Sequence, residues 1–301
     1  RAVQRLVAED DDGAVAGELS GCLDAYWNSP IAVAVEAFVT RRPDEEDLRR
    51  LRTRLQAWVA SDAVQSSDYL VRLRERQGGG FLALDDDSLS WGEAHALWDD
   101  PAKVNASGVP PDEQLLATSL APLFDDARQA ITLVSAYFVP GDRGVRLLGD
   151  LAARGVSVRV LTNSLQATDV PFVYNAYMDS REPLLAAGVG LYELKPFSHE
   201  RTLRNRYGIW GSSGASLHTK AMVFDRRVAF VGSFNLDPRS RLWNTEVGVI
   251  ARSEQLAAEL DDVLGEAFDP ASSYRLALEG KVVRHYTRDA AYAAFLERDA
   301  G

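Results

Sequence analysis

The sequence predicts an α/β fold in which helices flank a mixed, mostly parallel sheet. From residue 112 onward, short apolar runs alternate with amphipathic helical patterns, and turn-forming residues separate them. Such alternation is typical of βαβ units, whose crossover helices cover a parallel sheet. With 301 residues and 46% apolar composition, the chain can bury a large core in one large domain or two smaller ones.

Helical patterns dominate the first part of the chain. Apolar residues recur at helical spacing from Val15 to Tyr26, and this helix should end near Pro30. A second amphipathic helix is expected within residues 44–76, after the start signal Arg42-Pro43-Asp44 and before the glycines at 78–80. Residues 99–114, "DDPAKVNASGVPPDEQ", are rich in turn formers and are expected to form a loop.

Strands and helices alternate in the remainder. Strands are expected at 131–140, 156–162, 189–194 and 245–251, and "KAMVFD" and "VAFVG" should form a hairpin across Arg226 and Arg227. Helices are expected at 143–155 and 174–188, each closed by a glycine. A last helix should follow Ser253, which is placed to cap its N-terminus.

Charge and composition exclude several classes of protein. A formal net charge of −11 argues against a general nucleic-acid binder, which needs a basic face. The arginines at 201, 204 and 206 form either a solvated loop or a local attraction for phosphate or anionic lipid. Cys22, the single cysteine, excludes an intrachain disulfide and a zinc cluster of cysteines, and it is expected to be a buried apolar residue. The sequence contains neither a spanning apolar run nor an export signal.

The stretch from Leu217 to Ser240 gathers groups that suit phosphoryl chemistry. His218 and Lys220 are two residues apart, so a strand would point both side chains to one face. The following hairpin can bring Ser233 and Asn235 beside them. Together these groups supply a titratable nitrogen, a cation, a hydroxyl and an amide. Such a set can hold phosphate oxygens while the histidine attacks phosphorus or protonates a leaving oxygen.

The complete string H-x-K-x4-D-x6-G-S-x-N, from His218 through Asp225 to Asn235, resembles the signature of the phospholipase D superfamily. Further stretches, including "GSFNLDPRSRLWNTEVGVI" and "YFVPGDRGVRLLGDLAARGVSVRVLTNSL", resemble bacterial cardiolipin synthases of the third, shorter type. This likeness covers about residues 13 to 290. It implies phosphatidyl transfer through a phosphohistidine, without metal or other cofactor, and a phospholipase D-like layered domain.

The resemblance also implies roles for individual residues. His218 would be the general acid, Lys220 and Asn235 would hold phosphate oxygens, and Ser233 would assist. Glu246 resembles the carboxylate that orients the motif histidine; the alternative is an ordinary strand-edge carboxylate. Asp225 belongs to the catalytic signature, but at the start of a hairpin it could simply stabilise the turn.

Family members bring two such motifs together in one site, and this sequence contains one. His95, His199 and His285 have no lysine two residues later. The resemblance therefore predicts the C-terminal portion of a larger enzyme: residues 1–111 would be the tail of a first phospholipase D-like repeat plus a helical connector, and 112–301 the second domain. An upstream half-site or a second chain would supply the missing motif.

Three functions remain open on this basis. The first is a half of a cardiolipin synthase-like phosphatidyltransferase acting on phosphatidylglycerol or phosphatidylethanolamine. It would sit peripherally on the cytoplasmic side of the bacterial inner membrane and bind no nucleic acid. The second is a phospholipase or phosphodiesterase that passes the intermediate to water. The third is an inactive phospholipid-binding module.

Overall fold

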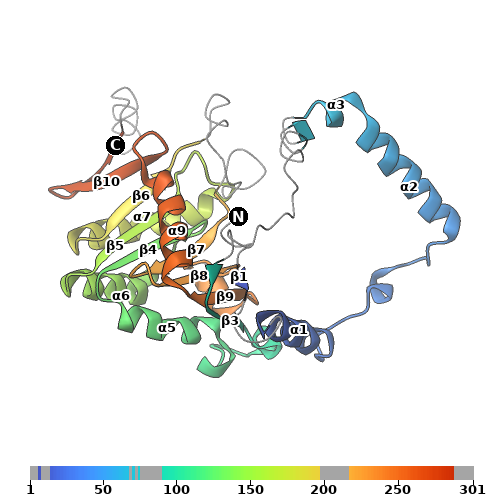
Figure 1. Ribbon diagram of the computed structural model, residues 1–301, viewed down its shortest axis with the longest axis horizontal. Helices are drawn as coiled ribbons and strands as arrows, with labels where there is room; N and C mark the ends of the chain where they lie inside the picture. Colours follow the sequence, from blue (N-terminus) through green and yellow to red (C-terminus); the bar gives the residue numbers. More distant parts are fainter. Residues whose placement is uncertain are drawn as a thin grey trace. The chain divides into compact units, whose positions relative to one another are not determined.

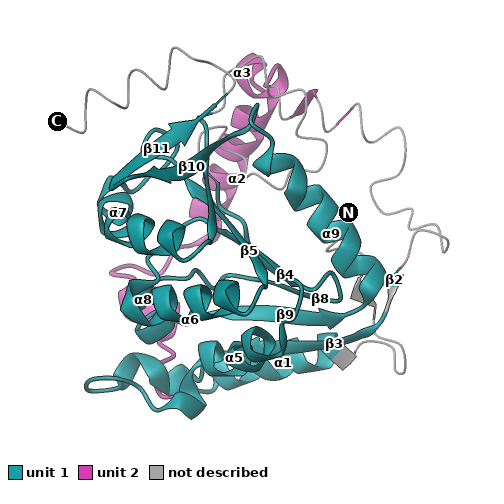
Figure 2. Cartoon of the chain, turned by 90° about the vertical axis from the view of Figure 1, so that its left-hand side faces the viewer, with its two compact units in different colours: residues 1–29, 90–301 teal, residues 30–89 magenta. Residues whose placement is uncertain are grey.

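The computed structural model describes residues 6–7, 14–67, 70–71, 74, 90–196 and 217–287 (Figure 1). The chain divides into two compact units, with residues 1–29 and 90–301 in unit 1 and residues 30–89 in unit 2 (Figure 2). This division differs from the boundary expected at 111/112, because residues 90–111 contribute a strand and turns to unit 1. The glycines at 78–80, His199 and the arginines at 201, 204 and 206 lie outside the described residues.

Among the described residues of unit 1, nine strands form a central sheet in the order β11-β10-β6-β5-β4-β7-β8-β9-β3. Its strands are β3 (Glu93–Trp98), β4 (Ala130–Ser135), β5 (Ser157–Asn163), β6 (Gly190–Leu194), β7 (Lys220–Phe224), β8 (Val228–Gly232), β9 (Val247–Arg252), β10 (Ser273–Glu279) and β11 (Val282–Tyr286). A separate short parallel pair joins β1 (Leu6–Val7) to β2 (Ser90–Trp91).

The α/β class and the mixed sheet are confirmed, but the expected parallel majority is wrong. Among the described strands, only the β4–β5 and β5–β6 pairings of this sheet are parallel. The other six pairings are antiparallel. The reason is that β7, β8 and β9 follow one another as neighbours, β10 and β11 form a hairpin, and short connections join antiparallel strands.

Helices cover both faces of the sheet. The helices in the described part of unit 1 are α1 (Ala14–Trp27), α5 (Leu116–Asp126), α6 (Gly141–Ala153), α7 (Pro171–Ala186), α8 (Pro238–Leu242) and α9 (Glu254–Gly265), with the 3-10 turns η4 (Pro101–Asn105), η5 (Asp112–Gln114) and η7 (Glu266–Phe268). The helices expected near α1, α6, α7 and α9 are confirmed, as is the Ser253 cap, whose side chain accepts from the backbone N–H of Leu256.

Alternation along the central strands separates two cores. On β7, Met222 and Phe224 pack with α5, α6 and α7, whereas Ala221 and Val223 pack with Leu260 and its neighbours on α9. Successive strand residues point to opposite faces, so a buried central strand needs apolar residues throughout. Figure 2 accordingly shows α9 on one side of the sheet and α5 and α6 on the other.

Unit 2 consists of helical elements without a core of its own among its described residues. They are η2 (Val35–Phe38), α2 (Glu45–Ala60) and α3 (Asp62–Gln65), and none of them contains a buried residue. The expected second helix is thus confirmed from Glu45. Within the ranges that the structure describes, no helix has both the length and the apolar character to cross a membrane.

Candidate active site

His218 directly precedes β7, and Lys220 is the first residue of that strand, in the middle of the sheet. The buried side chain of Asn163, at the end of β5, fixes this segment. Its Oδ1 accepts from the N–H of Leu217 at 2.8 Å, and its Nδ2 donates to the carbonyls of Leu217 at 3.0 Å and Ala136 at 3.1 Å. These bonds hold the backbone at Leu217, so the chain enters β7 in a defined position just before the exposed His218.

Lys220 places a desolvated cation beside the histidine. Its side chain is buried, and Nζ donates to the carbonyl of His218 at 2.8 Å. Burial lowers the pKa of Lys220, while the nearby carboxylates of Glu246, Asp169 and Asp237 oppose that shift. Charges interact more strongly where water is excluded, so a bound phosphate oxygen would gain more here than at an exposed lysine.

Ser233 follows β8 and lies against the start of β9. Its Oγ donates to Oε2 of Glu246 at 2.5 Å and accepts from the N–H of Val247 at 3.0 Å. The hydrogen bond recorded for the Glu246 carboxylate is therefore with Ser233. Among the described residues no hydrogen bond joins Glu246 to His218, so the structure does not show the contact expected to orient the imidazole.

Position 232 of the motif must be glycine because there is no room for a side chain, and not because of its backbone conformation. A Cβ at this position would lie 2.5 Å from the carbonyl oxygen of Val247 and 2.6 Å from Cα of Gly248. Real Cβ atoms do not approach backbone so closely, and the two glycines face each other in the β8–β9 ladder. A side chain here would push β8 away from β9 and would separate Ser233 from Glu246.

Asn235 is buried in the turn after β8 and is tied to the end of β4. Its Oδ1 accepts from the N–H of Tyr137 at 3.2 Å and from Oγ of Ser135 at 3.4 Å, and its own N–H donates to Oγ of Ser240 at 3.3 Å. Because the amide oxygen is used, the NH2 group is the part left to donate to a ligand. The sheet register pairs Ser135 with Lys220, which brings Asn235 to the Lys220 end of β7.

Tyr137 and Asp169 are part of this neighbourhood and were not predicted. Nζ of Lys220 lies 6.0 Å from the centre of the Tyr137 ring, and the Tyr137 hydroxyl donates to both carboxylate oxygens of Asp169 at 3.0 Å. Burial, followed by the bond to Asp169, raises the pKa of Tyr137 to about 12. Their positions were the one signal that could have found them, since Tyr137 follows β4 and Asp169 lies in the polar loop after β5.

The structure does not bring Asp225 to the other motif residues. Asp225 follows the opposite end of β7 from Lys220, which is roughly 16 Å away at the usual rise per strand residue. Its carboxylate accepts from the backbone N–H groups of Arg128, Gln129 and Ala130 at 2.9, 2.7 and 2.9 Å. Both Asp225 and Arg226 have positive φ, as in the type I′ turns that join hairpin strands. This position fits the turn-stabilising alternative and not contact with substrate.

Asp225→Asn tests that assignment through its pH dependence. Burial would raise the pKa of Asp225, but the three backbone hydrogen bonds outweigh burial and lower it. A lowered folded-state pKa means stability that is present above the unfolded value of about 3.9 and is lost as pH falls through the folded value. We expect Asp225→Asn to cost about 1–3 kcal/mol at pH 7. Urea titrations should show the gap to wild type closing below about pH 4.

Asparagine tolerates the left-handed backbone, so this variant isolates the carboxylate. The rate per folded molecule of an enzyme carrying both half-sites should stay within a few-fold of wild type. A rate loss as large as that expected for a general acid, with unchanged stability, would return Asp225 to the catalytic group.

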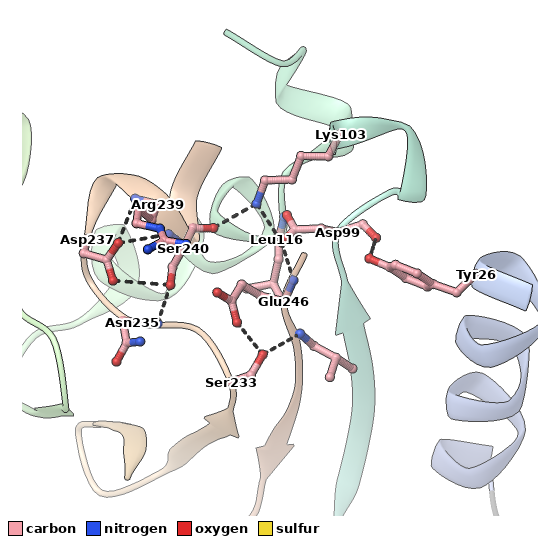
Figure 3. A network of polar contacts seen from close by, with 11 residues as sticks. Tyr26, Asp99, Lys103, Leu116, Ser233, Asn235, Asp237, Arg239, Ser240 and Glu246 are labelled. Carbon is pink, nitrogen blue, oxygen red and sulfur yellow. Dashed lines mark hydrogen bonds and ion pairs between the residues drawn. The ribbon is translucent and has the colours of Figure 1, made fainter. Parts of the chain in front are cut away.

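A buried ion pair links the site to the first part of the chain (Figure 3). Asp99 and Lys103 are both buried in the stretch expected to be only a loop. Oδ2 of Asp99 accepts from Nζ of Lys103 and from the N–H of Glu246, both at 2.8 Å, and Oδ1 accepts from the N–H of Leu116 at 2.7 Å. Lys103 also donates to the carbonyl of Ser240 at 2.8 Å.

This pair therefore supports the two turns that carry the site. It holds the backbone of Glu246, which bonds Ser233, and the backbone of Ser240, which bonds Asn235 (Figure 3). The carbonyl of Asp99 accepts from the Tyr26 hydroxyl of α1 at 2.8 Å. The sequence signal was an acid four residues before a lysine, which is ordinarily interpreted as a surface helix pair.

The other described histidines lie in separate environments. His95 on β3 is exposed and contacts Glu18 and Glu93, each at 3.0 Å. His285 on β11 contacts the buried Glu193 at 3.1 Å. Within the described ranges, no group of three or more histidine, cysteine, aspartate or glutamate side chains is arranged to hold a metal ion.

Comparison with known proteins gives consistent matches. The family model described as "Cardiolipin synthase, PLD-like domain" matches residues 120–267. Cardiolipin synthase C of Escherichia coli is 40% identical over 195 residues, which cover 64% of this chain and 41% of that protein. An uncharacterized Helicobacter pylori protein is 27% identical over 241 residues, covering 79% of this chain and 45% of its own.

The solved structures agree at the level of the fold. Phosphatidylserine synthase of Haemophilus influenzae superposes with a TM-score of 0.53 at 16% identity and covers 96% of this chain and 60% of that one. The chain spans less than half the length of the two curated relatives named above.

Proposed function

The chain belongs to the phospholipase D superfamily, and from that premise we propose that it forms one half of a cardiolipin synthase-like phosphatidyltransferase. The observation that carries the proposal is the group at the start of β7: an exposed histidine, a buried lysine and an amide whose oxygen is already bonded. These donors fit a phosphodiester, whose non-bridging oxygens need positive charge and hydrogen bonds in the transition state.

The proposed reaction needs a second histidine, which another half-site would supply. That histidine attacks phosphorus, the bond to the donor's head-group alcohol breaks, and His218 gives its proton to the leaving oxygen. His218 then takes the proton of an acceptor hydroxyl, whose oxygen attacks phosphorus and breaks the phosphorus–nitrogen bond. Lys220 and Asn235 hold the phosphate oxygens throughout, and Ser233 with Glu246 keeps the turn beside them in place.

We place the donor among phosphatidylglycerol and phosphatidylethanolamine, and the protein peripherally on the cytoplasmic side of the bacterial inner membrane. The similarity to Cardiolipin synthase C and to other cardiolipin synthases supports this choice. Lys220 supplies the positive charge in the proposed step, so a divalent ion is not required by it.

Product analysis in the presence of chelator tests the proposal. An enzyme that joins this chain to a half carrying a second motif should convert phosphatidylglycerol vesicles to cardiolipin, with one glycerol released per cardiolipin, at the same rate with and without EDTA. Phosphatidic acid as the main product would instead establish hydrolysis. Loss of activity on chelation, restored by magnesium, would contradict the metal-independent phosphohistidine reaction.

A further inference from the structure

Helix α2 in unit 2 exposes a continuous apolar stripe. The stripe consists of Leu48, Leu51, Leu55, Trp58 and Val59, whose exposed fractions run from 42% to 62%. At 3.6 residues per turn these five side chains lie within an arc of about 100°. A capping box between Asp44 and Asp47 stabilises the start of the helix, so the stripe belongs to a defined element.

Arginines border this stripe on both sides. By the same geometry Arg52 lies just beyond Val59, and Arg54 lies just beyond Trp58 on the other edge. Arg49 and Arg50 are ion-paired with Glu46 and Asp47, whereas no ion pair is recorded for Arg52 or Arg54 among the described residues. From Leu48 to Ala60 the helix carries no acidic residue.

We propose that α2 lies on anionic phospholipid membranes, with the apolar stripe inserted and Arg52 and Arg54 at the headgroups. An apolar face flanked by arginine, with tryptophan near its edge, is the arrangement that interfacial helices use. Lipid explains both halves of the surface, because its acyl region covers the stripe and its headgroups neutralise the bordering arginines. A net charge of −11 on the chain makes such local positive charge necessary for approach to an anionic surface.

This inference rests on the proposed function, which supplies the reason for membrane binding, but its test does not measure phosphatidyl transfer. The chain is sedimented with vesicles of phosphatidylcholine containing phosphatidylglycerol, and with pure phosphatidylcholine as the uncharged comparison. Binding should require the anionic lipid and should weaken as salt is raised.

Paired variants separate the stripe from the rest of the helix. Leu51→Glu with Leu55→Glu should weaken partitioning by on the order of 100-fold or more, because two inserted side chains become charged. Thr53→Glu with Ala57→Glu makes the same charge change on the opposite face and should weaken it far less. Arg52→Gln with Arg54→Gln should weaken partitioning into anionic vesicles about 30-fold. The same change to glutamine at the ion-paired Arg49 and Arg50 should weaken it less.

Hydrogen exchange keeps the test decisive if a variant unfolds the helix. In wild type, the α2 amides should gain protection when anionic vesicles are added. Protection that is already complete without vesicles and unchanged by them would show that protein covers the stripe, and a change of oligomeric state in the Leu51/Leu55 variant would identify a second copy. Either result, or equal binding by both glutamate pairs, overturns the proposal.

The two proposals can fail separately. His218→Ala should bind vesicles like wild type. If vesicles bind through α2 and no phosphatidyl transfer is found with a completed enzyme, the helix inference stands without the function. If transfer occurs and the α2 variants bind normally, the function stands without the helix.

Discussion

Replacing His218 with alanine is expected to slow phosphatidyl transfer by a completed enzyme by about 100- to 10,000-fold, the usual contribution of a general acid or base. The imidazole is exposed and lies just before β7, outside both apolar cores, so the fold should be unaffected. The rate of cardiolipin formation from phosphatidylglycerol measures the loss. His95→Ala is the matched control, because His95 is also exposed but lies on β3 beside Glu18 and Glu93.

A substrate with an activated leaving group assigns the role of His218. If His218 protonates the leaving oxygen, a nitrophenyl phosphodiester, which needs no proton, should recover much of the rate lost by His218→Ala. Equal loss on both substrates, together with failure to trap labelled phosphate on the variant, would make His218 the nucleophile. Near-normal rates on both substrates would remove the motif from catalysis altogether.

Asp99→Asn is expected to cost about 3–5 kcal/mol of the free energy of unfolding, the range for breaking a buried ion pair by removing one partner. The substitution preserves shape but leaves the Lys103 ammonium buried without its counter-charge, next to the neutral carbonyl of Ser240. Urea denaturation of the whole chain, followed by a spectroscopic signal of unit 1, measures the change.

The exposed pair of Arg227 and Glu254 is the control for this prediction. Its side chains are 65% and 72% exposed, so Arg227→Gln should cost under about 1 kcal/mol. The double variant Asp99→Asn with Lys103→Met should lose less free energy of unfolding than the two single variants lose together, since no charge is then left unpaired. A cost for Asp99→Asn no larger than that for Arg227→Gln would show that the buried pair does not hold the site together.

Local pattern predicted the elements of this fold but not their neighbours. The hairpin of β7 and β8, the Ser253 cap and the glycines that end α6 and α7 are encoded within a few residues, and each is confirmed. That β4 lies beside β7, and β9 beside β3, depends on contacts between distant segments, so alternation of strands and helices overestimated the parallel pairings. Strands β10 and β11 were missed, although Gly280 between them marks the turn.

The site divides in the same way. His218 and Lys220 are two residues apart, so their proximity follows from the sequence alone, whereas Asn163 and Tyr137 reach them through the sheet. Asp225 shares the motif but follows the other end of β7, which agrees with its expected place at the start of the hairpin. The buried pair of Asp99 and Lys103 was not predicted in the expected loop, because its burial depends on contacts with α5 and α8, which come later in the chain.

Cardiolipin formation by the chain alone tests the central claim, that this chain supplies one half-site and needs another. When two catalytic histidines act as a unit, removing either one removes most of the rate. A preparation verified as monomeric by ultracentrifugation, with lipid present, should produce little or no cardiolipin from phosphatidylglycerol. Joining it to a half with a second H-x-K-x4-D motif should restore synthesis. Robust synthesis by the verified monomer would contradict the account.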